Sequence, residues 1–212
     1  VMAASFDALW DTQVYGTRPD GGRFAYVWFA AGGCGAIKGR DGLSATAFPS
    51  GIAGVQSEMI EALVPIHIAK RELVTDSGGA GQWRGGLAQA FSISVDGEDG
   101  YIFSGLYDRI HYAAEGLEGG KAGATGTIAT RSGNPLKAKT RNWLQTDEEV
   151  TLTLPGGGGY GPALERDPAL VAQDVLNGYV SIKGAREDYA VVVDPHTFTV
   201  DHNATDKLRH PK

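Results

Sequence analysis

The residues best suited to chemistry are three polar groups close together, Asp108, Arg109 and His111. They follow a strand predicted over residues 101–106, and loops that leave a rigid strand often carry binding or catalytic groups. Together they could bind a polar or anionic small molecule. The alternative that we favour is structural, with an ion pair between Asp108 and Arg109 beside a histidine satisfied by its surroundings.

A fourth candidate is Arg84, which is set between glycines. Its planar guanidinium could bind a phosphate or carboxylate without obstruction from neighbouring side chains. The structural alternative, which we again favour, is an ion pair with Asp76 across the glycine turn. Arg84, Asp108, Arg109 and His111 are therefore the candidate substrate-binding residues. No catalytic residue can be assigned.

Two glycine-rich stretches resemble phosphate-binding loops, but each lacks a required part. Residues 79–84 place an arginine where the dinucleotide fingerprint needs a third glycine, and they lead into a predicted strand rather than a helix. Residues 116–121 are one residue short of a Walker A loop, and Ala122 replaces the magnesium-binding Ser or Thr. We therefore expect no nucleotide binding by this chain.

The histidines and the cysteine give no sign of a metal centre. No two histidines lie at the i, i+2 or i, i+4 separation that places two ligands on one face of a strand or helix. Cys34, the single cysteine, cannot form an intrachain disulfide and fits a reducing compartment. We expect no catalytic metal in this chain.

Glycine-separated strands are expected to dominate the first part of the chain. The sequence has 31 glycines, about twice the average share of roughly 7%. Alternating or β-branched segments predict strands at 24–30, 66–74, 87–95, 101–106, 125–130 and 149–154. A short helix is predicted over residues 57–63, capped by Ser57 and ended before Pro65. The glycines of residues 156–159 indicate close backbone packing or positive φ angles, with a ligand-binding loop as the alternative.

The last fifty residues change character. Asp167-Pro168 predicts a helix that runs to about Asn177 and is closed by Gly178. A second helix over 181–188, a strand over 189–193, and a helix capped by Asp201 should follow. We predict an α+β fold, with a β-rich body of residues 1–162 rich in glycine turns and a small α/β tail of residues 163–212.

Composition excludes several classes of partner. The net charge is −6 and no basic stripe is present, which argues against nucleic acid. The longest apolar stretch, residues 25–37, is shorter than a membrane span and is broken by glycines. With no signal peptide at its start, the chain is expected to be cytoplasmic. The sequence opens with Val1-Met2, which is unusual for an intact gene product. The chain could therefore be a fragment or part of a split subunit.

Read in order, a series of segments resembles the C-terminal portion of the hydantoinase B/5-oxoprolinase family. The matching segments are Met2-Ala-Ala-Ser-Phe6, Asp41-Gly-Leu-Ser44, Phe48-Pro-Ser50, Glu58-Met-Ile-Glu-Ala-Leu63, Asp76-Ser-Gly-Gly-Ala-Gly-Gln-Trp-Arg-Gly-Gly86, Phe103-Ser-Gly-Leu-Tyr-Asp-Arg-Ile-His111, Gly116-Leu-Glu-Gly-Gly120, Leu154-Pro-Gly-Gly-Gly-Gly-Tyr-Gly161, Asp167-Pro168 and Gly178-Tyr-Val-Ser181. The resemblance covers essentially the whole chain.

The resemblance implies a subunit of an ATP-dependent enzyme that hydrolyses a cyclic amide such as hydantoin, 5-oxoproline or a lactam. It implies a hydantoinase A-type partner that binds ATP and Mg²⁺, and an upstream hydantoinase B segment that holds a divalent metal. Phosphorylation of an amide or enolate oxygen explains the need for ATP. Two alternatives stay open: a subunit of a related ketone carboxylase, and a structural assembly module without catalytic groups. Four tryptophans in a β-rich body also suggest apolar surface that a partner covers.

Overall fold

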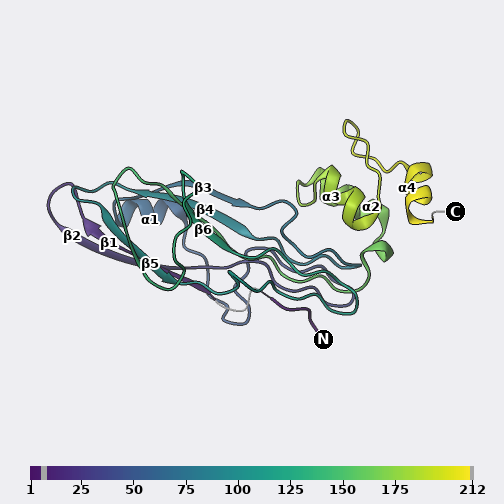
Figure 1. The fold of residues 1–212 in the computed structure, drawn as a ribbon, viewed down its shortest axis with the longest axis horizontal. Coiled ribbons are helices and arrows are strands. Elements are labelled where there is room, and N and C mark those ends of the chain that lie inside the picture. Colours follow the sequence, from purple (N-terminus) through teal and green to yellow (C-terminus); the bar gives the residue numbers. More distant parts are fainter. Residues whose placement is uncertain (6–8, 211–212) are drawn as a thin grey trace.

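The computed structural model describes residues 1–5 and 9–210 and is elongated (Figure 1). A β-sandwich forms one end, and extended chain segments run side by side through the middle. Three α-helices lie at the other end, next to the C-terminus. Phe6, the last residue of the first family-like segment, lies outside the described residues. Among the described residues, no helix is long and apolar enough to cross a membrane.

The first sheet contains four antiparallel strands in the order β2-β1-β5-β7. They are β1 (Trp10–Thr17), β2 (Arg23–Ala30), β5 (Tyr101–Leu106) and β7 (Arg141–Leu144). The second sheet is also antiparallel and has the order β3-β4-β8-β6. Its strands are β3 (Ile66–Leu73), β4 (Gln89–Val95), β6 (Thr127–Thr130) and β8 (Val150–Thr153).

The core lies between the two sheets, because alternate residues of each strand point inward. In β1 the buried residues are Trp10, Thr12 and Val14, while the intervening side chains are partly exposed. The helix α1 (Ser57–Leu63) adds Ile60 to this core and contacts β3. The predicted Ser57 cap was wrong. Gln56 is the N-cap residue, and its side chain makes no capping hydrogen bond.

Extended segments next to the sandwich hydrogen-bond to one another around a central segment, residues 156–161. Successive N–H groups of this segment donate to different neighbours. Two of these neighbours, residues 121–124 and 83–86, recur after three residues, whereas Gly158 donates to Ala4 and Gly161 donates to Leu117. The bonds, donor first, are Gly156 to Ala124 at 3.0 Å, Gly157 to Gly86 at 2.9 Å, Gly159 to Lys121 at 2.9 Å and Tyr160 to Trp83 at 2.9 Å. A period of three residues is that of a polyproline II-type helix, which makes no hydrogen bonds within itself, so its peptide groups bond to neighbouring segments. We call residues 156–161 together with the segments around them, residues 33–36, 77–86 and 114–124, the glycine rod.

Close backbone contact explains the glycines of the rod. A Cβ added to Gly157 would lie 2.0 Å from the carbonyl oxygen of Cys34, and one added to Gly158 would lie 2.1 Å from that of Glu115. None of the glycines at positions 156–159 has a positive φ. Of the roles expected for these residues, close packing is therefore confirmed and positive φ was wrong. Neighbouring backbone fills the space that a ligand would need.

The tail contains η1 (Ala163–Glu165), α2 (Pro168–Leu176), α3 (Ile182–Tyr189) and α4 (His202–Arg209). The predicted caps are confirmed, since the side chains of Asp167 and Asp201 accept from backbone N–H groups. The strand predicted over 189–193 was wrong: α3 continues to Tyr189, and Val193 forms only an isolated bridge with Val200. A second apolar cluster fills the tail, with Ala80 of the rod as a member.

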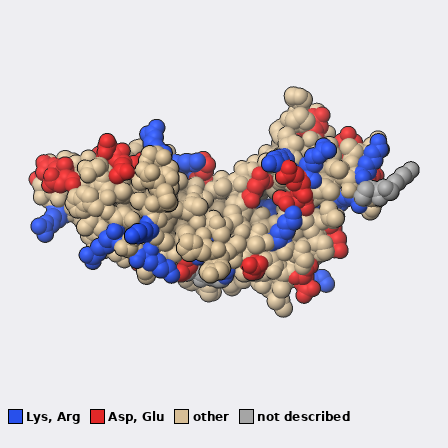
Figure 2. Space-filling model, viewed as in Figure 1, with Lys and Arg blue, Asp and Glu red and all other residues tan. Residues whose placement is uncertain are grey.

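The α+β class and the β-rich body are confirmed, and the six predicted strands are present with ends shifted by up to two residues. The sequence prediction missed β1 and β7. In β1, polar residues interrupt the apolar ones, and β7 begins with two polar residues, Arg141 and Asn142. The division into two domains at Pro162 stays a prediction. On the face drawn in Figure 2, acidic and basic side chains are interspersed.

Replacing Gly157 with valine should prevent folding or destabilise the protein by more than about 3 kcal/mol, because the rod has no room for a Cβ at this position. Gly157→Ala should have the same effect in weaker form. Gly54→Ala is the matched control, since its Cβ would meet only the end of the Arg71 side chain, at 3.0 Å, and no backbone atom. Urea unfolding measures the difference. A stable Gly157→Val protein impaired only in ligand binding would contradict this account.

Candidate functional site

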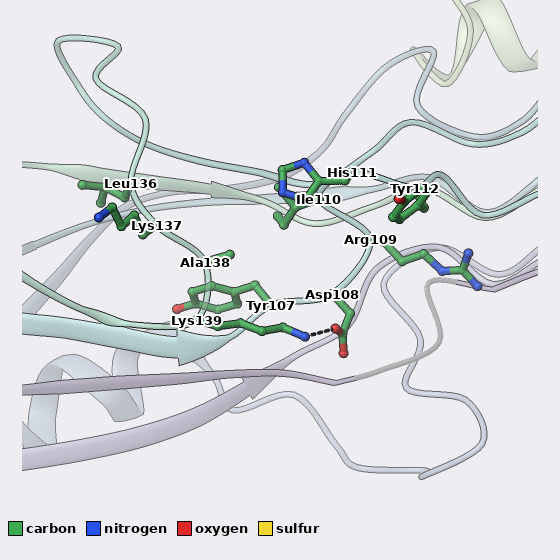
Figure 3. A pocket seen from close by; sticks show the side chains of 10 residues that line it. All are labelled: Tyr107, Asp108, Arg109, Ile110, His111, Tyr112, Leu136, Lys137, Ala138 and Lys139. Carbon is green, nitrogen blue, oxygen red and sulfur yellow. Dashed lines mark hydrogen bonds and ion pairs between the residues drawn. The ribbon is translucent and has the colours of Figure 1, made fainter.

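A cavity of about 640 Å³ contains three of the four candidate residues (Figure 3). Its lining comes from two segments, the loop after β5 and residues 136–139 before β7. Ile110, Leu136 and Ala138 contribute apolar surface, while charged side chains occupy the rim. Mostly apolar cavities with a few polar groups are typical of sites for small molecules.

Tyr107 fixes the position of the loop after β5. Its buried ring packs against Trp10, with centroids 4.7 Å apart, and stacks on Phe103. Its hydroxyl donates a hydrogen bond to Thr12 Oγ1 at 3.2 Å. Burial raises the pKa of Tyr107, so the phenol stays neutral and keeps this role as donor. The polar residues that follow are therefore attached to the sandwich core.

Arg109 turns the chain at the cavity. Its φ is +58°, a conformation that a non-glycine residue adopts rarely and at a cost of about 1–3 kcal/mol. Two hydrogen bonds hold the turn: Nη1 donates to the Ala113 carbonyl at 2.9 Å, and Gly126 N–H donates to the Arg109 carbonyl at 2.9 Å. Such strain often marks functional loops.

Asp108 pairs with Lys139, with Oδ1 and Nζ 2.5 Å apart (Figure 3). The predicted ion pair with Arg109 was therefore wrong, since the Arg109 side chain extends away from the Asp108 carboxylate. Sequence reasoning missed Lys139, because it lies 31 positions away and reaches the cavity only through the β5–β7 pairing. His111 is exposed at the rim. Because the Asp108–Lys139 pair is about half exposed, it stabilises the fold little and its groups are available to a ligand.

Arg84 lies outside this cavity and is buried in the glycine rod. Its Nε is 3.4 Å from Asp174 Oδ2, and its Nη1 donates to the Gly85 carbonyl at 2.7 Å. The predicted ion pair with Asp76 was wrong: the Asp76 carboxylate accepts from the Ser181 N–H. Arg84 thus has a structural partner, but that partner comes from the tail. Its role in substrate binding stays a prediction.

Arg84 belongs to a buried cluster of ion pairs that joins the tail to the rod. Arg166 bonds Asp41 in a bidentate manner, with both N–O distances 2.7 Å, and its Nη2 lies 2.8 Å from Asp174 Oδ2. The Arg166 side chain is 2% exposed and that of Asp174 is 8% exposed. Spacing in the sequence cannot reveal this cluster, since Asp41 and Arg166 are 125 positions apart.

The opposite charges of Asp41 and Arg166 set the pKa of each group. Burial acts to raise the pKa of Asp41, but the hydrogen bonds and charge of Arg166 outweigh it and lower that pKa below its ordinary value. Burial likewise disfavours the charged form of Arg166, yet Asp41 and Asp174 raise its pKa. Asp41 and Arg166 are therefore both ionised at neutral pH.

Neither glycine-rich loop resembling a phosphate site precedes a helix in the structure. Both loops are segments of the rod, and a Cβ on Gly79 or Gly116 would meet a carbonyl oxygen at 2.2 or 2.1 Å. Within residues 1–5 and 9–210, no group of three or more His, Cys, Asp or Glu side chains could hold a metal ion.

A sandwich with an attached glycine rod, a loop cavity and a helical tail defines a module found in larger enzyme subunits. The chain belongs to the Hydantoinase B/oxoprolinase family, which matches residues 1–163. An uncharacterized protein from Methanocaldococcus jannaschii is 38% identical over 159 residues, which are 72% of this chain and 28% of that protein. The caprolactamase subunit beta of Pseudomonas jessenii is 34% identical, over 76% of this chain and 30% of the subunit.

Two solved structures share the fold over nearly the whole chain. The ATP-dependent caprolactamase of Pseudomonas jessenii matches with a TM-score of 0.81 and 28% identity, covering 99% of this chain and 38% of that chain. Nucleotide-free acetone carboxylase matches with a TM-score of 0.82 and 25% identity, covering 98% of this chain and 33% of that chain. This chain thus spans 33–38% of these two chains and 28–30% of the two relatives above.

Replacing Asp174 with alanine should release the tail from the rod. Two buried guanidinium groups, those of Arg84 and Arg166, would lose a shared carboxylate, a change worth about 3–5 kcal/mol for a buried pair. Asp188→Ala is the control, because it breaks the exposed pair with Lys121. Hydrogen exchange should show loss of protection in α2 and α3 for Asp174→Ala alone. Unchanged protection in the Asp174 variant would refute this role.

The Asp41–Arg166 pair should add an acid-sensitive contribution to stability. The folded-state pKa of Asp41 is lowered, so the contribution is present above the ordinary Asp pKa of about 3.9 and is lost as pH falls through the folded value. Thermal melts of the protein and of Asp41→Asn should differ most near neutral pH and converge below about pH 4. Parallel curves over the whole range would rule out this contribution.

Proposed function

We propose that this chain is part of a hydantoinase B-type subunit of an ATP-dependent enzyme that hydrolyses a cyclic amide: hydantoin, 5-oxoproline or a lactam. The observation that carries the proposal is the likeness to caprolactamase. Its subunit beta is 34% identical over 76% of this chain, and the solved caprolactamase shares the fold over 99% of it. The family match over residues 1–163 supports the same class.

In this proposal the reacting groups are shared among several segments. A hydantoinase A-type partner binds ATP and Mg²⁺, and the upstream hydantoinase B segment holds a divalent metal. Phosphorylation of the amide oxygen makes the carbonyl carbon a better electrophile for water. This chain supplies the cavity beside Asp108 and Lys139, fixed through Tyr107 to a rigid core. The complex is expected to act in the cytoplasm on a small molecule.

A second candidate function is ATP-dependent carboxylation of a ketone. The likeness to acetone carboxylase supports it, with a TM-score of 0.82 against 0.81 for caprolactamase. A third is a purely structural module, supported by the glycine rod and by the location of Arg84 in a buried ion cluster. We prefer the hydrolase because sequence identity is higher to caprolactamase than to acetone carboxylase, 34% against 29% in sequence and 28% against 25% in structure.

Assays on the assembled enzyme separate the first two candidates. The chain is co-expressed with the upstream hydantoinase B segment and the A-type partner, and ATP hydrolysis is measured with each substrate. Stimulation by 5-oxoproline, hydantoin or caprolactam supports the hydrolase. Stimulation only by acetone with bicarbonate overturns it in favour of the carboxylase.

The isolated chain should neither hydrolyse ATP nor retain a metal ion. Both near matches to phosphate loops lie inside the rod, where backbone atoms occupy the space beside the glycines. Isothermal titration with ATP and elemental analysis of the purified chain measure the two properties together. Micromolar ATP affinity, or stoichiometric zinc or manganese, would contradict this division of roles.

Alanine at Asp108, Arg109 and His111 together should lower kcat/KM of the assembled enzyme by about tenfold or more, equivalent to about 1.4 kcal/mol. The variant should still assemble, because the Asp108–Lys139 pair is about half exposed and the bond from the Gly126 N–H to the Arg109 carbonyl does not need the side chain. Glu72→Ala is the matched control, since it removes a comparable exposed pair with Lys70. If both proteins keep full activity, the cavity is structural and the third candidate gains support.

A further inference from the structure

The outer face of the first sheet is unusually apolar for a surface exposed to water. An antiparallel sheet with one solvated face normally alternates apolar residues inward and polar residues outward. Here the outward side chains of β2 include Val27 and Phe29, which are 46% and 41% exposed. Leu106 at the end of β5 is 58% exposed, and Trp143 in β7 is 61% exposed. We call this surface the outer face of the first sheet.

Strand register gathers these side chains into rows across the sheet. One row contains Phe29, Asp11 and Leu106, which are directly paired between neighbouring strands. A second row contains Ala25, Tyr15, Ile102 and Trp143. A third row, Val27, Gln13, Ser104 and Arg141, lies between them, and it is polar except for Val27. Apolar groups from all four strands therefore lie on this face, in two rows on either side of the third.

The second sheet provides an internal comparison. Its outward residues in β4 and β8 are small or hydroxyl-bearing: they include Ala90 and Ser92, which are buried, and the Ser92 hydroxyl bonds that of the partly buried Thr151 at 2.7 Å. Thr153 follows on the same side of β8 and is also only partly buried. The two sheets share one core but differ in their outer surfaces. The apolar outer face therefore belongs to the first sheet in particular.

The outer face is also hollowed. A depression of about 690 Å³ lies between β1, β2 and β5, lined by Tyr15, Arg23, Ile102 and Trp143 among others. A smaller one of about 240 Å³ contains Gln13, Ser104 and Leu106. Interfaces concentrate their binding energy where an aromatic or aliphatic side chain fills such a depression, and tryptophan is enriched there.

We propose that this face is the docking surface for the rest of the hydantoinase B-type subunit, the upstream segment. The inference rests on the proposed function. This chain covers only 30% of the caprolactamase beta subunit and 38% of the solved caprolactamase chain, so most of such a subunit lies outside it. Contacts within one subunit are permanent, and permanent interfaces are more apolar than transient ones. The outer face is apolar and has a tryptophan at its edge, so it resembles a permanent interface more than one for a partner that binds and dissociates.

The test is co-purification of the upstream segment with the tagged 212-residue chain, without any assay of activity. Leu106→Asp and Trp143→Asp place a charge on the outer face, and each should weaken capture by about tenfold or more. Leu176→Asp is the matched control, because Leu176 is 56% exposed but lies on α2 of the tail. Far-UV circular dichroism and the thermal midpoint verify that each variant is folded.

A second measurement needs no substitution. Hydroxyl-radical footprinting of the wild-type chain should show Trp143 protected when the upstream segment is bound, while Met59, 54% exposed on α1, stays reactive. The proposal would be overturned if both face variants captured as much of the upstream segment as the wild-type chain does. It would also be overturned if Trp143 stayed unprotected. Two other results would also overturn it. One is a dimer of the isolated chain that Leu106→Asp dissociates, and the other is a face variant that still captures the upstream segment but no longer binds the A-type partner. Capture through this face without hydrolysis of any cyclic amide would support the docking surface and count against the proposed function.

Discussion

Side-by-side hydrogen bonding of glycine-rich segments is the interaction on which the rest of this structure depends. Successive N–H groups of residues 156–161 donate to neighbouring segments on different sides, and two of these segments recur after three residues. Any side chain at Gly157 or Gly158 would collide with a neighbouring carbonyl. The sandwich and the helical tail are both attached to this rod, so its packing sets their relative positions. A high glycine content here means rigidity rather than flexibility.

The buried cluster of Asp41, Arg84, Arg166 and Asp174 has a different physical character. Burying charges opposes folding, and only close, multiple hydrogen bonds offset that cost. The bidentate Asp41–Arg166 contact provides them, and Asp174 lies between the two guanidinium groups. Because the carboxylates come from the body and the tail, the cluster fixes how the tail packs on the rod. Specific orientation, more than added stability, is the contribution we assign to it.

The proposed division of labour follows from these two interactions. A rigid rod and a closed ion cluster leave little room for reacting groups, and the loop cavity beside Asp108 and Lys139 is where a small molecule could contact this chain. The apolar outer face of the first sheet gives this chain a second proposed role, in binding the upstream segment of the subunit. In such an enzyme, this chain positions one wall of a site that other segments complete.

The sequence alone determined the local features: six strands, the Asp167 and Asp201 helix caps and the family resemblance, because periodicity, capping and motifs act over a few residues. It also singled out the loop after β5, since a polar cluster at a strand end is visible in one short segment. Only the tertiary structure decided the partners. Asp108 pairs with Lys139 and Arg84 with Asp174, 31 and 90 positions away, because strand pairing and rod packing bring them together. The strand β1 escaped prediction for the same reason: its polar outer residues are stabilised by pairing with β2 and β5, which no local pattern reveals.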